Sequence, residues 1–200
     1  MAETSDTTFA YPVVLDLHDV PVLVVGGGRI GARKAAGLAA AGALVRLVAT
    51  EVSTHVDRSG VDDVRERAFE PIDLDDVRLV VTATGDATVD AAVSAAARAR
   101  GIWTNAADQP IDCGFILPAI VRRGRVSVAV STDGASPALA RELRNVLADL
   151  LTVEIGELAD ELASERAAVQ ASGASTEDID WGPRVRDGIS RALAARNLAP

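Results

Sequence analysis

Three glycines near the start of the chain have a spacing that suits a bound phosphate group. Gly26, Gly28 and Gly31 form the pattern G-x-G-x-x-G, which follows the apolar run VLVV and precedes an alanine-rich stretch. In such a turn the first glycine permits a tight bend, the second lets the backbone approach a pyrophosphate, and the third lets a helix pack close to the strand. Unpaired N–H groups and the positive dipole end of that helix favour the phosphates. The pattern therefore predicts a dinucleotide site.

A carboxylate stands where such a site would need one. Glu51 lies 20 positions after Gly31, at the end of a second apolar run. A carboxylate there accepts hydrogen bonds from the ribose hydroxyls and repels a 2′-phosphate, so the sequence favours NAD over NADP. We expect Arg29 to lie near the same ribose, where it would soften this exclusion of NADP. We expect the other contacts, on the adenine and nicotinamide sides, to be Thr50, Thr82, Thr84 and Gly85.

Alternating strands and helices must position these residues. The apolar, β-branched run at 22–25 is typical of a strand that is buried on both faces of a parallel sheet. Further strands are predicted at 44–49, 64–69, 79–85 and 101–108. Helices are predicted at 29–41, which Gly42 would end, and at 86–100. Strands and helices in this order predict a Rossmann-type, doubly wound α/β sheet.

The pattern changes after about residue 112. Two apolar runs at 115–121 and 126–131 are joined at Arg-Arg-Gly-Arg and predict a hairpin. Ser136 as N-cap and Pro137 at the first helical position then predict the start of a helix. Apolar residues recur at three- and four-residue spacing as far as Leu162, so we expect one amphipathic helix of about eight turns.

The apolar residues of this helix form a leucine-rich stripe that must pack against another surface, and the sequence allows two such surfaces. The stripe packs on its own sheet or forms a dimer interface, and the second segment is short for burying it alone, which favours a homodimer. A polar stretch at 171–180 is expected to be a linker, and 183–196 a final helix. The expected domains are an NAD-binding Rossmann domain at 1–112, a small α+β dimerisation and substrate segment at 113–155, and a helical C-terminal region at 156–200.

The composition argues against several classes of protein. The chain has 200 residues and a net charge of −9, and only one of its 20 basic residues is a lysine, Lys34. Nucleic-acid binding needs clustered positive surface, which this composition does not favour. The single cysteine, Cys113, allows no intrachain disulfide and is expected to be a small buried residue, and histidines at 18 and 55 predict no metal cluster. Without a signal-like N-terminus or an apolar run of about 18 residues, we expect a soluble, cytoplasmic protein.

Five blocks of the sequence resemble one known family. In chain order they are YPVVLDL, VLVVGGGRIGARKAAGL, LVVTATGD, NAADQPIDCGFILPAIVRRG and VSVAVSTDGASPALARELR, which span about residues 11–151. In all of them the chain is similar to precorrin-2 dehydrogenase, the enzyme that also forms the N-terminal part of bacterial siroheme synthases. The block STDGASPALAR is the most specific, because generic Rossmann domains lack it.

The resemblance implies that a homodimer oxidises precorrin-2 to sirohydrochlorin with NAD⁺. It matches the family's essential aspartate to Asp108, which we expect to act as a general base or to steer the substrate through pyrrole N–H groups. The residues that match NAD-contacting positions are Arg29, Ile30, Thr50 and Glu51. Many members have alanine where Gly31 stands, and we expect either residue to be small enough here. Some members also insert Fe²⁺ into sirohydrochlorin, which leaves ferrochelatase activity open for this chain.

The implied substrate is a polycarboxylate, so an acidic protein needs a local group of arginines to bind it. The hairpin and the helix after it supply such a group, and the helix start adds N–H donors for an anion. The predicted substrate contacts are Arg122, Arg123, Arg125, Ser131, Thr132, Ser136, Arg141 and Arg144.

The sequence is also compatible with two other functions. A non-enzymatic NAD-sensing module would share the glycine turn, Glu51 and the long helix, but it would not require Asp108 or the arginines. A dehydrogenase for another small acid is the second, although the usual catalytic histidine or Tyr-x-x-x-Lys pair does not occur in the sequence.

Overall fold

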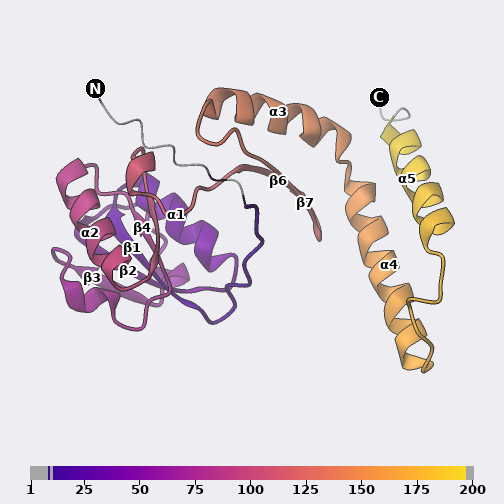
Figure 1. Cartoon of the computed structure of the whole chain (residues 1–200), viewed down its shortest axis with the longest axis horizontal. Helices are drawn as coiled ribbons and strands as arrows, with labels where there is room; N and C mark the ends of the chain where they lie inside the picture. Colours follow the sequence, from indigo (N-terminus) through magenta and orange to yellow (C-terminus); the bar gives the residue numbers. More distant parts are fainter. Residues whose placement is uncertain (1–8, 10, 197–200) are drawn as a thin grey trace. The chain divides into compact units, whose positions relative to one another are not determined.

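The computed structural model describes residue 9 and residues 11–196 of the chain (Figure 1). The chain divides into two compact units, of which the first ends at Leu117 and the second begins at Pro118. Among the described residues, no helix is both long enough and apolar enough to span a membrane.

In the described residues, a parallel sheet of five strands forms the centre of the first unit. Its strands are β1 (Pro21–Gly27), β2 (Leu44–Val52), β3 (Asp63–Glu66), β4 (Leu79–Thr82) and β5 (Trp103–Ala106). They pair in the order β3-β2-β1-β4-β5, and Val22 of the central strand aligns with Val45 of β2 and Leu79 of β4. The predicted Rossmann-type sheet is confirmed. The strand order changes direction between β1 and β4, the point at which open α/β sheets bind ligands beyond the carboxyl ends of their strands.

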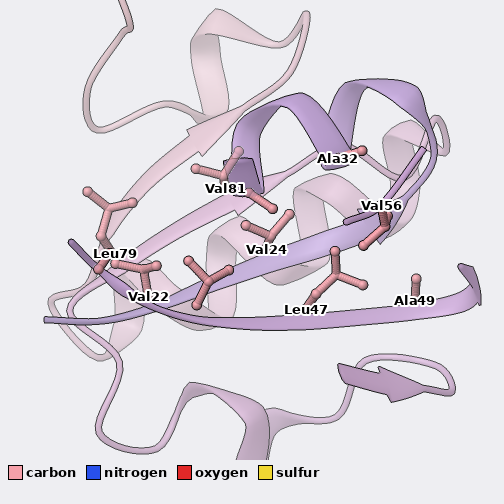
Figure 2. Close-up of a cluster of buried hydrophobic side chains, with 11 residues drawn as sticks. Val22, Val24, Ala32, Leu47, Ala49, Val56, Leu79 and Val81 are labelled. Carbon is pink, nitrogen blue, oxygen red and sulfur yellow. The ribbon is translucent and has the colours of Figure 1, made fainter. Parts of the chain in front are cut away.

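Alternate residues of β1 bury opposite faces of this sheet. The helices that cover the two faces are α1 (Arg29–Ala39) and α2 (Ala87–Ala99). Val22 and Val24 pack in one cluster with Ala32 of α1, as Figure 2 shows. Leu23 packs on the other face with Val93 of α2. The uninterrupted apolar run of β1 is thus explained, because side chains alternate between two faces that are both covered.

Some strands end earlier than the sequence predicts, and their connections include short turns of 3₁₀ helix. These turns are η1 (Arg58–Gly60), η2 (Pro71–Leu74) and η3 (Pro110–Asp112). β3 ends at Glu66 because Arg67 turns to bind Asp73 with hydrogen bonds of 2.6 and 2.8 Å. β4 ends at Thr82, and the chain turns at Gly85, which has a φ of +81°.

The second unit joins a hairpin to helices. Its elements are β6 (Ala119–Arg123), β7 (Val126–Val130), α3 (Pro137–Leu150), α4 (Val153–Ala171) and α5 (Gly182–Arg196). The antiparallel hairpin and the final helix are confirmed. The predicted start of α3 is confirmed too, because the Ser136 hydroxyl accepts a hydrogen bond from the backbone N–H of Leu139 at 3.2 Å.

The prediction of one continuous helix as far as Leu162 is wrong. After α3 ends, Leu151 takes a non-helical ψ of 85°, and α4 then begins as a separate helix. α4 packs on the hairpin turn through Gly156, where a Cβ would lie only 2.7 Å from the carbonyl oxygen of Arg123. α4 is thus held against the hairpin by a contact between distant parts of the sequence, whereas the apolar spacing continues across the break.

A buried carboxylate holds the connection that follows β3. Asp73 is fully buried, and it accepts hydrogen bonds from Arg65 at 2.7 Å, from Arg67 and from the backbone N–H of Glu70 at 2.9 Å. Burial alone would raise the pKa of Asp73, but these donors outweigh it and lower the pKa from 3.8 to about 2. A carboxylate with a lowered pKa in the folded state stabilises the fold above its unfolded-state pKa, and this stabilisation is lost as the pH falls toward 2.

We predict that Asp73→Asn lowers the free energy of unfolding by about 2 kcal/mol at pH 7, because one pKa unit corresponds to about 1.4 kcal/mol. The difference from wild type should shrink between about pH 4 and pH 2, where the wild-type carboxylate takes up a proton. Urea unfolding at several pH values measures both effects. The control is Asp75→Asn, which removes an exposed ion pair with Arg100 and should cost less than about 0.5 kcal/mol. Equal losses in the two variants would contradict the prediction.

Candidate functional site

The glycine turn between β1 and α1 makes two backbone contacts that a side chain would prevent. Gly26 has a φ of +120°, and a Cβ there would collide with the backbone of Ala83 just after β4. A Cβ at Gly31 would collide with the carbonyl oxygen of Gly26. The expectation that alanine would fit equally well at position 31 is therefore wrong for this backbone, because main chain cannot rotate out of the way.

Gly28 differs from these two glycines because the space beside it is open. A Cβ at Gly28 would meet no protein atom within 4 Å, and its φ of −77° is one that any residue adopts. Gly28 is the N-cap of α1, and no side chain caps this end of the helix. First-turn N–H groups beside open space are the arrangement that receives a pyrophosphate. The residues of the turn therefore fit a dinucleotide.

The end of β2 lies beside the glycine turn. Gly27 pairs with Val52, the last residue of β2. Thr50 and Glu51 are exposed just before this pair. The other predicted contacts that are exposed in the turn are Arg29 and Ile30. The structure thus brings together the residues that the sequence predicts for the ribose and the pyrophosphate.

The turn after β4 is held by a carboxylate beneath it. Asp90 of α2 is almost fully buried, and it accepts hydrogen bonds from the Thr84 hydroxyl at 2.8 Å and from the Thr84 N–H at 3.2 Å. Gly85 follows as an exposed residue. The Thr82 side chain is fully buried and lies beneath this edge. Of the contacts predicted for this turn, only Thr84 and Gly85 reach the surface.

Asp108 lies at the same carboxyl edge of the sheet. The N–H of Ala107 donates to the carbonyl oxygen of Thr82 at 2.9 Å, which joins the end of β5 to the end of β4. Asp108 comes next, exposed and with a φ of +61°, a left-handed conformation that aspartate and asparagine tolerate better than most residues. An exposed carboxylate at this position can accept a proton from a bound molecule and pass it to water.

Sequence reasoning missed a polar group close to Asp108. The Lys34 ammonium donates to Oδ1 of Asn105 at 3.5 Å, across 71 positions of sequence. Burial lowers the pKa of Lys34 and the adjacent Arg33 lowers it further, whereas Cys113 and Asp108 act in the opposite direction. The only signal in the sequence is that Lys34 is the single lysine of the chain.

Cys113 is buried, which confirms its prediction as a small interior residue. Its Sγ accepts a hydrogen bond from the N–H of Ala106 at 3.2 Å, and burial raises the pKa of the thiol. A buried thiol with a raised pKa is a poor nucleophile. Within the described residues, no group of three or more histidine, cysteine, aspartate or glutamate side chains is arranged to hold a metal ion.

The predicted substrate arginines of the second unit differ in what they already bind. Arg125 forms an ion pair with Asp160 at 2.7 Å, and Arg123 donates to the carbonyl oxygen of Ala148 in the last turn of α3 at 3.3 Å. The Nε of Arg144 is buried without a hydrogen-bond partner among the described residues. The exposed members on β6 and α3 are Arg122 and Arg141. Arg123 and Arg125 thus connect the hairpin to the helices. Arg122, Arg141 and Arg144 have donors that can bind carboxylates.

The predicted hydroxyl contacts form the turn that starts α3. Thr132 Oγ1 accepts a hydrogen bond from the N–H of Ser136 and donates one to its carbonyl oxygen, both at 3.1 Å. Ser131 Oγ accepts from the N–H of Asp133 at 3.2 Å. The three hydroxyls thus shape this turn, and they share the second unit with the arginines.

Comparison with known proteins finds matches in both units. Residues 13–119 match the family described as "Putative NAD(P)-binding", and residues 123–150 match the family described as "Sirohaem biosynthesis protein central". A siroheme synthase of Methylococcus capsulatus is 43% identical over 163 residues, which are 80% of this chain and 34% of that protein. A siroheme synthase of Zymomonas mobilis is 35% identical over 192 residues, which are 94% of this chain and 37% of that protein. The chain thus spans about a third of the length of these curated relatives.

A solved structure gives a match over its whole length. It is described as "SirC, precorrin-2 dehydrogenase" and is 27% identical to this chain, with a TM-score of 0.69. The similarity covers 94% of this chain and 100% of that one. Both units of the fold therefore have a counterpart in one solved protein.

We predict that Gly28→Ala weakens the binding of NAD⁺ at least about ten-fold, which corresponds to about 1.4 kcal/mol. The added Cβ would fill the open space in which a pyrophosphate approaches the backbone. Thermal stability should stay the same, because no protein atom lies near that Cβ. Isothermal titration with NAD⁺ and thermal unfolding measure the two effects.

Gly37→Ala is the matched control for this prediction. Gly37 lies within α1, and a Cβ there also meets no protein atom within 4 Å. This variant should bind NAD⁺ as the wild type does and should be more stable by about 0.5–1 kcal/mol, because alanine favours the helix. If Gly28→Ala kept its affinity for NAD⁺, the turn would not be the binding site.

Proposed function

We propose that this chain, which belongs to the NAD(P)-binding family, oxidises precorrin-2 to sirohydrochlorin with NAD⁺. The observation that carries the proposal is the likeness to the solved precorrin-2 dehydrogenase over that protein's whole length. The identity with siroheme synthases and the match of residues 123–150 to the sirohaem family add support. The open glycine turn and Asp108, at one edge of one sheet, supply the groups that such a reaction needs.

The reaction removes a hydride and a proton from the macrocycle. NAD⁺, when bound, supplies the hydride acceptor. The first-turn N–H groups of α1 hold its pyrophosphate, and Glu51 accepts hydrogen bonds from the ribose and repels a 2′-phosphate. Asp108 accepts the proton, and its exposure lets that proton pass to water. The products are sirohydrochlorin, NADH and H⁺, so electrons and protons balance.

The carboxylates of the substrate are expected to bind to arginines of the second unit. Arg122 and Arg141 are exposed, and the Nε of Arg144 has no hydrogen-bond partner among the described residues. Guanidinium groups suit this role because each can donate two parallel hydrogen bonds to one carboxylate. Iron insertion and a cytoplasmic location stay predictions that depend on the resemblance and on the composition.

A homodimer is the second part of the proposal. Along α3 the side chains of Leu139, Leu143, Val146 and Leu150 are exposed to 51, 42, 58 and 47%. Their spacing puts them on one face of the helix. Single exposed apolar residues are ordinary, but a continuous stripe is typical of an interaction surface. Two copies of α3 packed face to face would bury this stripe in an isologous interface.

The proposal predicts that the wild-type protein converts precorrin-2, generated in situ, with equal formation of sirohydrochlorin and NADH, both followed by absorbance. NADP⁺ should give a lower kcat/KM because Glu51 repels the 2′-phosphate. Asp108→Asn should lower kcat by about 10²–10⁴-fold, because asparagine cannot accept the proton. Its affinity for NAD⁺ should not change, since asparagine keeps the left-handed backbone of this position.

Asp76→Asn is the matched control for Asp108→Asn. Asp76 is another exposed aspartate of the first unit, with a φ of +64°, and it precedes β4 rather than following a strand. This variant should turn over as the wild type does. A wild type that binds NAD⁺ without oxidising precorrin-2 would support the NAD-sensing module instead. Retained turnover in Asp108→Asn would mean that another group takes the proton.

Leu143→Asp should convert the wild-type dimer to a monomer, because a charge in the apolar stripe is costly to bury. Sedimentation velocity at several protein concentrations measures this change. Asn145→Asp adds the same charge on a different face of α3, where Asn145 is exposed, and should leave the dimer intact. A monomeric wild type, or equal dissociation of both variants, would argue that the stripe is not the interface.

A further inference from the structure

Lys34 is a half-buried cation with little to compensate its charge. It is the single lysine of the chain and lies in the second turn of α1. Its ammonium has three donors, and within the described residues it makes one hydrogen bond, to Oδ1 of Asn105 at 3.5 Å. None of the ion pairs found among the described residues at 4.0 Å or less involves Lys34. A charged group that is partly removed from water in this way favours an anionic partner.

The acceptor of this hydrogen bond is held rigidly. Asn105 lies in β5 and is only 6% exposed. Its Nδ2 donates to the carbonyl oxygen of Phe115 at 3.0 Å and lies 3.7 Å from Sγ of Cys113. These contacts fix which end of the amide is the oxygen, and they direct that oxygen toward Lys34. The ammonium is therefore kept in place by the fold even without a bound molecule.

The charged groups that act on Lys34 are one cation and one carboxylate, together with a thiol. Its charged and titratable neighbours are Arg33 on its own helix, and Asp108 and Cys113 from the segment after β5. Cys113 is buried with a raised pKa and so carries no negative charge at neutral pH. Asp108 is close enough to interact with Lys34 electrostatically but does not form an ion pair with it. Both charges therefore remain available to a molecule bound at this edge.

We propose that Lys34 binds one carboxylate of the tetrapyrrole beside Asp108 and so contributes to holding the ring at this edge of the sheet. This inference rests on the proposed function. A polycarboxylate macrocycle carries its negative charges on the rim and its N–H donors inside, and a neighbouring ammonium and carboxylate match one group of each kind. Lys34 is then a substrate-binding residue of the first unit, separate from the arginines of the second.

The test compares variants of the full-length chain at two neighbouring positions. Lys34→Met removes the charge and keeps an unbranched stem, and Lys34→Arg keeps a cation. Arg33→Met is the matched control, because Arg33 is the adjacent exposed cation of the same helix and has no assigned role. Two quantities are measured for each protein: the KM for precorrin-2 at saturating NAD⁺, and the Kd of sirohydrochlorin from an absorbance titration without NAD⁺.

Lys34→Met should raise both the KM and the product Kd by about ten-fold, the size of effect expected for a lost charge-assisted hydrogen bond. Its kcat and its affinity for NAD⁺ should stay near those of the wild type, and Lys34→Arg should recover most of the loss. Arg33→Met should behave as the wild type does. Thermal unfolding of each variant verifies that it folds, and Lys34→Gln serves in place of Lys34→Met if the latter does not.

Three results would overturn the proposal. One is unchanged KM and product affinity in folded Lys34→Met. Another is an equal loss in Arg33→Met, which would indicate a general effect of positive charge. The last is a fall in kcat with KM unchanged, which would make Lys34 a partner of Asp108 in proton transfer. Failure of the proposed function is a separate result, because it would be seen as missing turnover in the wild type.

Discussion

The backbone of Gly26 lies against the backbone of Ala83, and the candidate site depends on this contact. β1 and β4 end side by side only because position 26 has no side chain, and its φ of +120° turns the chain out of the strand. α1 then starts over the carbonyl oxygen of Gly26, where Gly31 again leaves no room for a Cβ. These contacts put the helix end beside the carboxyl ends of the strands. Gly28 alone is free of such contacts, so packing does not require a glycine there, whereas the proposed approach of a pyrophosphate to this backbone would require one.

The distribution of positive charge sets a second constraint, because the chain is acidic with a net charge of −9. Several arginines are committed to the fold itself, such as Arg65 and Arg67 around the buried Asp73 and Arg125 on Asp160. These arginines are therefore less available to an anionic ligand than their number suggests. A half-buried cation without an ion pair among the described residues, such as Lys34, needs a different reason to be held in that place.

The sequence predicts the sheet well because β1 is buried on both faces, and a short, β-branched apolar run followed by glycines is typical of such a strand. It predicts the start of α3 equally well, because Ser136 and Pro137 act locally. It fails where the decisive contact is distant. Apolar spacing cannot reveal that the helix breaks at Leu151, that Gly156 packs on the hairpin, or that Lys34 and Asn105 meet across 71 positions. Strand patterning likewise cannot show that Thr82 lies under the edge that its neighbours form.

Two anionic ligands at one sheet edge, next to Glu51 and Asp108, would repel each other unless each is compensated separately. For the pyrophosphate, the uncapped N-terminus of α1 supplies N–H groups and a dipole without using a lysine. Lys34 is a turn further along the same helix, and its hydrogen bond to Asn105 directs the ammonium toward β5 instead of toward the glycine turn. One helix thus presents two positive features to two places, its dipole to the nucleotide and its lysine to the neighbourhood of Asp108. This separation would let the proposed polyanionic substrate and a dinucleotide occupy the same edge while Asp108 stays free to take a proton.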